Sequence, residues 1–454
     1  MTFVTIAVAL LGSAMVLILG PVDGLVTYVA LYMLYPPYLA VSLGTVSINA
    51  HRIVVVVLLC RVLLDHRSRA KSRWTVLDVL LVGSFAAMAV ALSLRADLGI
   101  VMENRGGAFL DMIVPYVIAR SVIHNQQDLV RLAKGLSLVV IPVAVLAVVE
   151  SVAGWSPYAG LGQFSFLSGG AVGGEGPELR WGLNRAGGAV GGCISFGFCF
   201  VVLLPMMLLL VRQRGTWRTI GFIATGSAFA GTISSMSSGP LLGLVASSAA
   251  MALSVRPSHA KPALCLVLLA ALAAEIGSNR HFYHLVGYVT FSSGTAWYRA
   301  RLLEVAVGKL PEYWLLGYGF KDPGWGPELD MRGYTDVCNQ YILMACRGGG
   351  LPVVLFVGAL GHALARLRRV FRSGCGDVLK TASWYVGSMV VGMAVAITSA
   401  GLLGAEGLFY AMLGVVGSGA FSVVPGVQPR LPVVVCPRTS MAPGIHVYSQ
   451  TADH

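Results

Sequence analysis

Charged side chains are scarce in this sequence: Asp, Glu, Lys and Arg make up 11% of its 454 residues, whereas a typical soluble domain carries about 25%. Hydrophobic residues make up 56%, and the mean hydropathy is +0.77. This composition excludes an ordinary soluble domain and a disordered chain. The apolar runs are continuous and do not alternate every second residue, which excludes a membrane β-barrel. The sequence therefore predicts an all-α polytopic membrane protein.

Several chemical motifs are also missing. The eight cysteines form no CxxC pair and no Cys/His metal spacing, and His281 and His284 have no third ligand in register, so we predict no metal site and no cofactor. The sequence contains no Walker loop, no GxSxG and no outward DxD pair. These absences argue against an ATPase, a serine hydrolase and a metal-dependent glycosyltransferase.

Thirteen apolar runs predict the membrane-spanning helices, since one helix crosses a bilayer with about 20 residues. Their approximate bounds are 2–20, 24–44, 51–65, 75–94, 107–124, 132–154, 188–211, 219–236, 239–255, 262–278, 338–365, 381–402 and 406–425. Pro36 and Pro37 interrupt the second run, and the third run is short. In the alternative, the second and third runs form a re-entrant pair, and the chain then has twelve spans. The first run is interpreted as a retained helix and not as a signal peptide.

Basic residues gather in short clusters between the apolar runs, near 67–73, 131–134, 212–218, 256–261 and 366–372. The net charge of +12 would suggest a nucleic-acid partner in a soluble protein. Here the clusters follow the positive-inside pattern, so we predict a lipid bilayer as partner, no nucleic acid, and cytoplasmic clusters. The transmembrane domain would cover residues 1–425. Its outward segments include 155–187 and a large loop, 279–337, between the tenth and eleventh spans, and 426–454 would form a mostly disordered cytoplasmic tail.

Arginines in these two outward segments are the first candidate site residues. The stretch TAWYRARLLEVAVGKL predicts an amphipathic helix, with Leu303, Ala306, Val307 and Leu310 on its apolar face. Arg299 falls on that face, whereas Arg301 points away. A planar guanidinium binds carboxylate or phosphate bidentately; the alternative is an internal ion pair of Arg299 with Glu304 or Glu312.

Arg180 and Arg185 close the other outward segment, just before the span that begins near residue 188. Together with Arg299 they predict one anion clamp built from two loops. The alternative for Arg185 is a plain interfacial anchor beside the span.

The third candidate element is TDVCNQYILMACRGGGLPVVLF, which places Asp336, Cys338 and Asn339 at the outer start of a long apolar helix, where anions are attracted. In a catalytic role, Asp336 would accept a proton from a hydroxyl nucleophile and Asn339 would orient that hydroxyl. In the alternative, Asp336 or Thr335 is an ordinary N-cap and Asn339 only lines the surface.

With these residues in view, the sequence resembles the O-antigen ligase and O-antigen polymerase family of bacterial membrane proteins, in order over most of residues 50–420. Four stretches carry the resemblance: AFLDMIVPYVIARSVIHNQQDLVRLAKG with VLAVVESVAGW, GTISSMSSGP, RARLLEVAVGKLPEYWLLGYGF, and TDVCNQYILMACRGGGL. In the third stretch, Arg299 is the arginine in register, and Gly317 and Gly319 form the G-x-G turn.

The resemblance implies a glycosyltransferase-C-like bundle and an inverting, metal-independent transfer of a glycan from undecaprenyl diphosphate to a sugar or lipid-linked glycan acceptor. The reaction would take place at the outer face of the bacterial inner membrane, with Arg180 and Arg299 on the diphosphate. Family members commonly carry His, or Asp in some branches, where this sequence has Cys338. This departure leaves three interpretations. In the first, Asp336 replaces the base; in the second, Cys338 itself acts as a positioning residue; in the third, the activity is lost.

Ligase and polymerase share the donor and differ in the acceptor, and the sequence does not separate them. The competing interpretations are a transporter of a lipid-linked sugar or small anion and a non-catalytic subunit of a polysaccharide assembly complex. Charges gathered in outward loops, without a pair of broken helices at mid-membrane, favour the enzyme.

Overall fold

The computed structural model describes residues 2–43, 46–65, 74–164, 179–277, 293–330, 334–373 and 376–422. Met1–Ser422 forms one compact unit. The basic cluster at 67–73, the Gly-rich part of the segment 155–187, the start of the loop 279–337, His281, His284 and the tail 426–454 lie outside the described residues.

The described chain is predominantly helical, as predicted. Its α-helices are α1 (Thr2–Ile18), α2 (Pro21–Leu34), α3 (Ala50–Leu64), α5 (Val76–Ser93), α6 (Leu98–Ala108), α7 (Val114–Val122), α8 (Gln126–Ala153), α9 (Cys193–Val211), α10 (Thr216–Ser234), α11 (Ser238–Ala252), α12 (Ala260–Gly277), α13 (Ser293–Gly308), α14 (Leu310–Tyr313), α15 (Gln340–Gly348), α16 (Gly350–Arg372), α17 (Asp377–Ala396) and α18 (Glu406–Gly417). A π-helical turn, Phe109–Ile113, joins α6 to α7. Each predicted apolar run overlaps at least one of these helices.

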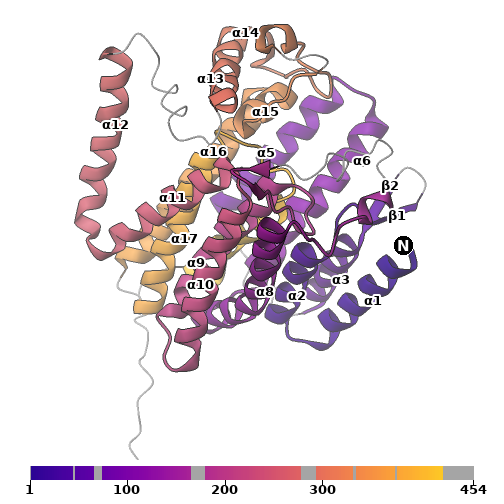
Figure 1. Cartoon of the computed structure of the whole chain (residues 1–454), viewed down its shortest axis with the longest axis vertical. Coiled ribbons are helices and arrows are strands. Elements are labelled where there is room, and N and C mark those ends of the chain that lie inside the picture. Colours follow the sequence, from indigo (N-terminus) through magenta and orange to yellow (C-terminus); the bar gives the residue numbers. More distant parts are fainter. Residues whose placement is uncertain are drawn as a thin grey trace, which may run out of the picture. The chain divides into compact units, whose positions relative to one another are not determined.

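Among the described residues, six helical segments are long and apolar enough to cross a membrane: α5, α8, α9, Ser238–Val255, α16 and α17. The apolar helices α1, α2 and α18 are shorter. In Figure 1, α12 stands apart from the other helices, and it exposes Leu264, Leu266 and Leu269, as a lipid-facing helix would. These features support a membrane protein, while the total of twelve or thirteen spans stays a prediction.

Helix α9 lies at the centre of the core: 78% of its apolar window is buried, against 39 to 56% for the other five long segments. Glycines let α10 approach it closely. A Cβ on Gly231 would lie 2.4 Å from the Phe200 ring, and one on Gly221 would lie 2.6 Å from the backbone of Val211. Small residues at helix contacts supply van der Waals packing in a bilayer, where hydrophobic burial between helices adds little.

The amino-terminal prediction needs correction, because α2 ends at Leu34, before Pro36 and Pro37, and does not continue to residue 44. Proline cannot donate a helical hydrogen bond and restricts the residue before it. A small antiparallel hairpin follows, β1 (Ala40–Leu43) with β2 (Val46–Asn49). A second short hairpin pairs β3 (Leu179–Arg180) with β4 (Leu183–Asn184), so the bundle is not purely helical.

The predicted span 338–365 is also wrong as a single helix, since α15 stops at Gly348 and α16 begins at Gly350. Gly349 has a φ of 78°, and the amide of Gly350 donates to the Trp314 carbonyl at 2.6 Å. The turn after α14 therefore packs against the junction between α15 and α16. Gly317 and Gly319 of that turn have positive φ values of 69° and 72°, which agrees with the predicted G-x-G turn.

A second, smaller hydrophobic core holds this outer region together. Trp325 is fully buried, and it packs with Leu302, Tyr313 and Ile342 from α13, α14 and α15. Figure 1 shows α13, α14 and α15 together at one end of the bundle. This core fixes the orientation of α13, which carries Arg299.

The helix break yields a stability prediction. A Cβ on Gly349 would lie 2.1 Å from the Leu315 carbonyl oxygen at a φ that L-residues rarely adopt. We expect Gly349→Ala to lower the free energy of unfolding by about 2 kcal/mol or more, measured by thermal unfolding in detergent. The matched control is Gly361→Ala, inside α16 with no atom within 4 Å of the added Cβ, which should be neutral or stabilise by about 0.5–1 kcal/mol. Equal behaviour of the two variants would contradict the strained break.

Candidate functional site

The side chains of the three predicted arginines converge on the turn between α10 and α11. Arg180 Nη1 donates to the Met236 carbonyl at 3.2 Å, Arg185 Nη2 to Ser237 Oγ at 3.1 Å, and Arg299 Nη1 to Ser238 Oγ at 2.8 Å. Arg180 belongs to β3, Arg185 follows β4, and Arg299 lies on α13. We call Arg180, Arg185 and Arg299 the arginine cluster. Arginines from segments more than a hundred positions apart thus contact three consecutive residues, Met236, Ser237 and Ser238, at the end of this turn and the start of α11.

Arg299 lies on the packed face of α13, although the predicted apolar stripe was displaced by one position. Leu302, Val305 and Ala306 are among its buried residues, whereas Val307 and Leu310 are 65% and 47% exposed. The second hydrophobic core lies against that face, so tertiary contacts decide which apolar side chains are covered. Arg299 precedes Leu302 and Ala306 by three and seven residues, which keeps it on the covered side.

The acids considered as partners for Arg299 bind elsewhere. Glu304 pairs with the exposed Arg301 at 2.9 Å, and Glu312 accepts a hydrogen bond from Tyr318 at 2.9 Å. The Arg299 Nε is buried without a hydrogen-bond partner among the described residues. A buried cationic donor with an unused N–H favours an anionic ligand.

Burial lowers the pKa of Arg299, and the positive charge of Arg185 lowers it further, while Asp336 and Cys338 oppose the shift. Arginine nevertheless stays protonated in proteins. Two guanidinium groups are therefore held close enough to repel each other, and an anion placed between them would relieve that repulsion.

Arg185 is positioned by backbone contacts of the three residues that follow it. The Glu150 carboxylate at the end of α8 accepts hydrogen bonds from the amides of Gly187 and Gly188, at 3.4 and 3.0 Å. Ala186 N donates to the Ser234 carbonyl of α10 at 2.9 Å. Glu150 is thus a positioning residue that sequence reasoning did not select, although a carboxylate at the end of an apolar helix was the available signal.

Asp336 and Cys338 lie beside the arginine cluster. The positive charge of Arg299 lowers the pKa of the Cys338 thiol, but burial is the larger effect and raises that pKa to about 11. The thiol is therefore neutral at pH 7. Burial also raises the pKa of Asp336, and Arg299 partly opposes that shift. Of these two groups, the carboxylate is the one able to accept a proton.

Asn339, and neither Asp336 nor Thr335, is the N-cap of α15, so the alternative that made Asp336 or Thr335 the cap is wrong. Its Oδ1 accepts hydrogen bonds from the amides of Tyr341 and Ile342, at 2.9 and 3.1 Å, and its Nδ2 donates to the Thr398 carbonyl at 2.7 Å. The structure thus gives Asn339 an architectural role, which ties the start of α15 to the segment after α17.

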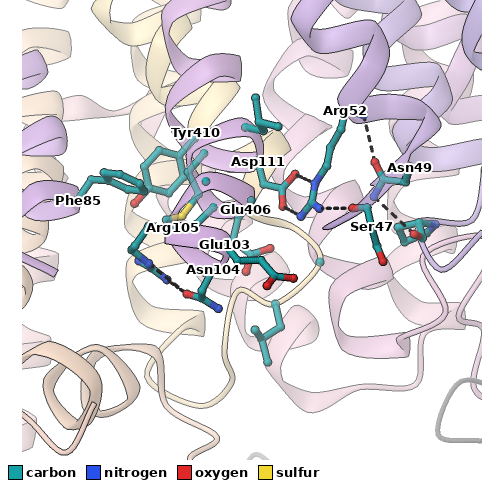
Figure 2. Close-up of a pocket in the computed structure, with 18 of the residues that line it drawn as sticks. Ser47, Asn49, Arg52, Phe85, Glu103, Asn104, Arg105, Asp111, Glu406 and Tyr410 are labelled. Carbon is teal, nitrogen blue, oxygen red and sulfur yellow. Dashed lines mark hydrogen bonds and ion pairs between the residues drawn. The ribbon is translucent and has the colours of Figure 1, made fainter. Parts of the chain in front are cut away.

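A large cavity forms a second feature, which sequence reasoning missed. It has a volume of about 1560 Å³ and is lined from α3, α5, α6, α15 and the start of α18. Figure 2 shows Arg52 and Asp111 facing each other across two hydrogen bonds of 2.9 and 2.5 Å, with Arg105 on another part of the wall. No sequence motif predicts this cavity, because its lining residues come from separate helices.

Comparison with models of known protein families gives no match, and no curated protein matches the chain. Within the described ranges, no three His, Cys, Asp or Glu side chains are grouped to hold a metal ion. The geometry of the arginine cluster and the resemblance of the sequence to the O-antigen ligase and polymerase family are therefore the observations that bear on function.

The cap assignment makes a prediction. Asn339→Ala should lower the free energy of unfolding by about 1–2 kcal/mol, because it removes the cap of α15, whereas Asn339→Asp keeps a cap acceptor and should lose less. Thermal unfolding in detergent measures both variants. If Asn339→Ala retains full stability but loses activity, Asn339 acts on the substrate and not on the helix.

Proposed function

We propose that this protein transfers a glycan from an undecaprenyl-diphosphate-linked donor to a sugar acceptor at the outer face of the bacterial inner membrane, as an O-antigen or polysaccharide ligase or polymerase. One observation carries the proposal: Arg180, Arg185 and Arg299 converge on the turn before α11, with Asp336 and Cys338 beside them. The donor class comes from the sequence resemblance, and the convergence supports a site for its diphosphate.

The position of the arginine cluster suits a diphosphate. Ser237 precedes the first turn of α11, where unsatisfied backbone amides and the helix dipole attract anions. Guanidinium groups add charge-assisted, bidentate hydrogen bonds to phosphate oxygens. A fixed set of such donors stabilises charge as it develops on a leaving group, and this is often the largest single contribution to rate.

The proposed reaction is a direct displacement at the anomeric carbon. The acceptor hydroxyl oxygen forms the new glycosidic bond as the bond from that carbon to the phosphate oxygen breaks, and the diphosphate leaves with the electron pair. Asp336 accepts the hydroxyl proton. Attack opposite to the leaving group inverts the anomeric configuration. A carboxylate of raised pKa is a stronger base than an exposed one, and the neutral thiol of Cys338 is left to position the acceptor or Arg299.

The alternatives share the arginines but do not need a base. A transporter of a lipid-linked sugar or small anion would use the arginine cluster for capture, and a non-catalytic subunit would use it for binding alone. Loss of product on changing Asp336, with donor binding intact, separates the enzyme from both.

The arginine prediction compares two neighbours on α13. Arg299→Ala should lower polysaccharide formation by about 10²–10³-fold, because it removes a donor aimed at the leaving group, and Arg299→Lys should also fail, since an ammonium cannot reproduce the bidentate fork. Arg301→Ala is the control, because Arg301 is exposed and pairs with Glu304, and it should keep most activity. The assay follows polymer formed from lipid-linked donor in membranes, and equal losses at normal protein level would rule out the assignment.

The base prediction concerns Asp336. Asp336→Asn should lower product formation by about 10²–10⁴-fold, the range of general base catalysis, at unchanged protein level and donor binding. Cys338→Ser should be mild, because the thiol is not the base. Full activity of Asp336→Asn, or a gain in product for Cys338→His, would remove the base role from Asp336.

A further inference from the structure

The large cavity contains two arginines, Arg105 of α6 and Arg347 of α15, that the proposed chemistry does not use. Arg105 donates to the neighbouring Asn104 side chain at 2.6 Å and lies 5.7 Å from the Phe85 ring centroid. Within the described part of the chain, neither guanidinium has a carboxylate within 4 Å. The pKa of Arg105 is lowered by burial and then by the charge of Arg347, so the two cations also act on each other.

Four other charged side chains line the cavity: Arg52, Glu103, Asp111 and Glu406. Asp111 is paired with Arg52. Glu406, at the start of α18, attracts Arg347, although no ion pair of 4 Å or less joins them in the described part of the chain. Glu103 is exposed. Arg105 and Arg347 are the two arginines of the wall that form no ion pair among the described residues, so we expect their ligand to be an anion.

The size and lining of the cavity indicate what carries the anion. A volume of about 1560 Å³ exceeds the roughly 300–1,000 Å³ of sites for small molecules. Tyr32, Tyr38, Phe85 and Tyr410 contribute to its wall, and Figure 2 shows Phe85 and Tyr410 on the same side as Arg105. Aromatic faces pack against the C–H faces of sugar rings, so the wall suits a glycan of several sugars.

Helix α15 connects this cavity to the arginine cluster. Cys338 stands beside Arg299 just before the helix begins, while Gln340, Leu343 and Arg347 line the cavity. Nine residues of α-helix extend about 13 Å, a length that two or three sugar units span. An acceptor with its reacting hydroxyl at Asp336 would reach Arg347 with an anionic group a few sugars away.

We propose that this cavity binds an anionic glycan, the acceptor of the reaction, and that Arg105 and Arg347 hold its phosphate or carboxylate group. The acceptor role depends on the proposed function, whereas anion binding by these two arginines does not. The proposal names a substrate class: the acceptor carries a negative charge within a few sugars of the reacting hydroxyl.

The test measures binding by isothermal titration to the whole protein in phosphatidylcholine nanodiscs. Trigalacturonate and glucose 6-phosphate are the anionic sugar probes, maltotriose is the neutral one, and farnesyl diphosphate reports on the arginine cluster. Arg105→Gln and Arg347→Gln should each lower the affinity for the anionic sugars by about tenfold or more. The affinity for farnesyl diphosphate should not change. Arg299→Gln should do the reverse, and the exposed control Arg301→Gln should change neither. Thermal unfolding confirms that each variant is folded.

The possible failures are distinguishable. The cavity proposal is overturned if neither anionic sugar binds, if maltotriose binds as tightly, or if Arg105→Gln and Arg347→Gln bind like the unchanged protein. It is also overturned if phosphatidylglycerol in the nanodisc displaces the sugars, which would assign the arginines to a lipid headgroup. Farnesyl diphosphate binding that ignores Arg299 contradicts the proposed donor site, while sugar binding that still depends on Arg347 would leave the anion site standing.

Discussion

The hydrogen bond from Arg299 to Ser238 joins α13 to the start of α11 and holds the arginine cluster together. Burial of a guanidinium costs free energy unless it is hydrogen-bonded. The bond from Arg299 Nη1 to Ser238 Oγ therefore favours a fixed position of α13 against the start of α11. Glycines bring the supporting helices close enough. A Cβ on Gly197 of α9 would lie 2.6 Å from Ser235 Oγ and 2.7 Å from Pro240. The small residues of GTISSMSSGP thus form a rigid base for three charged side chains.

Helix α15 is the second constraint, because it connects the arginine cluster with the large cavity. Its start is fixed by the Asn339 cap and by Gln340, whose amide donates to the Ile397 carbonyl at 2.9 Å. Its end is fixed by the break at Gly349 and by the turn that carries Gly317. A short helix held at both ends keeps a constant distance between the proposed reaction centre and the proposed acceptor pocket, and such a fixed distance would position an acceptor for reaction.

The helical class and the apolar runs could be predicted from the sequence, because composition and hydropathy are local signals. The clamp of Arg180, Arg185 and Arg299 is predicted only from the presence of arginines in two outward segments, and the turn on which they converge could not be predicted, because it depends on tertiary packing. The covered face of α13 could not, since Val307 and Leu310 are apolar but the second core packs against Leu302 and Val305 instead. The same holds for the cap, where Thr335 and Asp336 are good cap residues but Asn339 takes the position. The cavity depends on side chains from separate helices, and no periodicity reports such an assembly.

The most direct test of the central claim is a cryo-electron-microscopy density map of the protein in a nanodisc with undecaprenyl diphosphate. We expect density for the two phosphates at the turn before α11. Their oxygens should lie roughly 2.7–2.9 Å, the length of a charge-assisted hydrogen bond, from the guanidinium nitrogens of Arg299 and of at least one of Arg180 and Arg185. Phosphates bound at Arg105 and Arg347 instead, or an arginine cluster that stays empty while the lipid is bound elsewhere, would contradict this expectation.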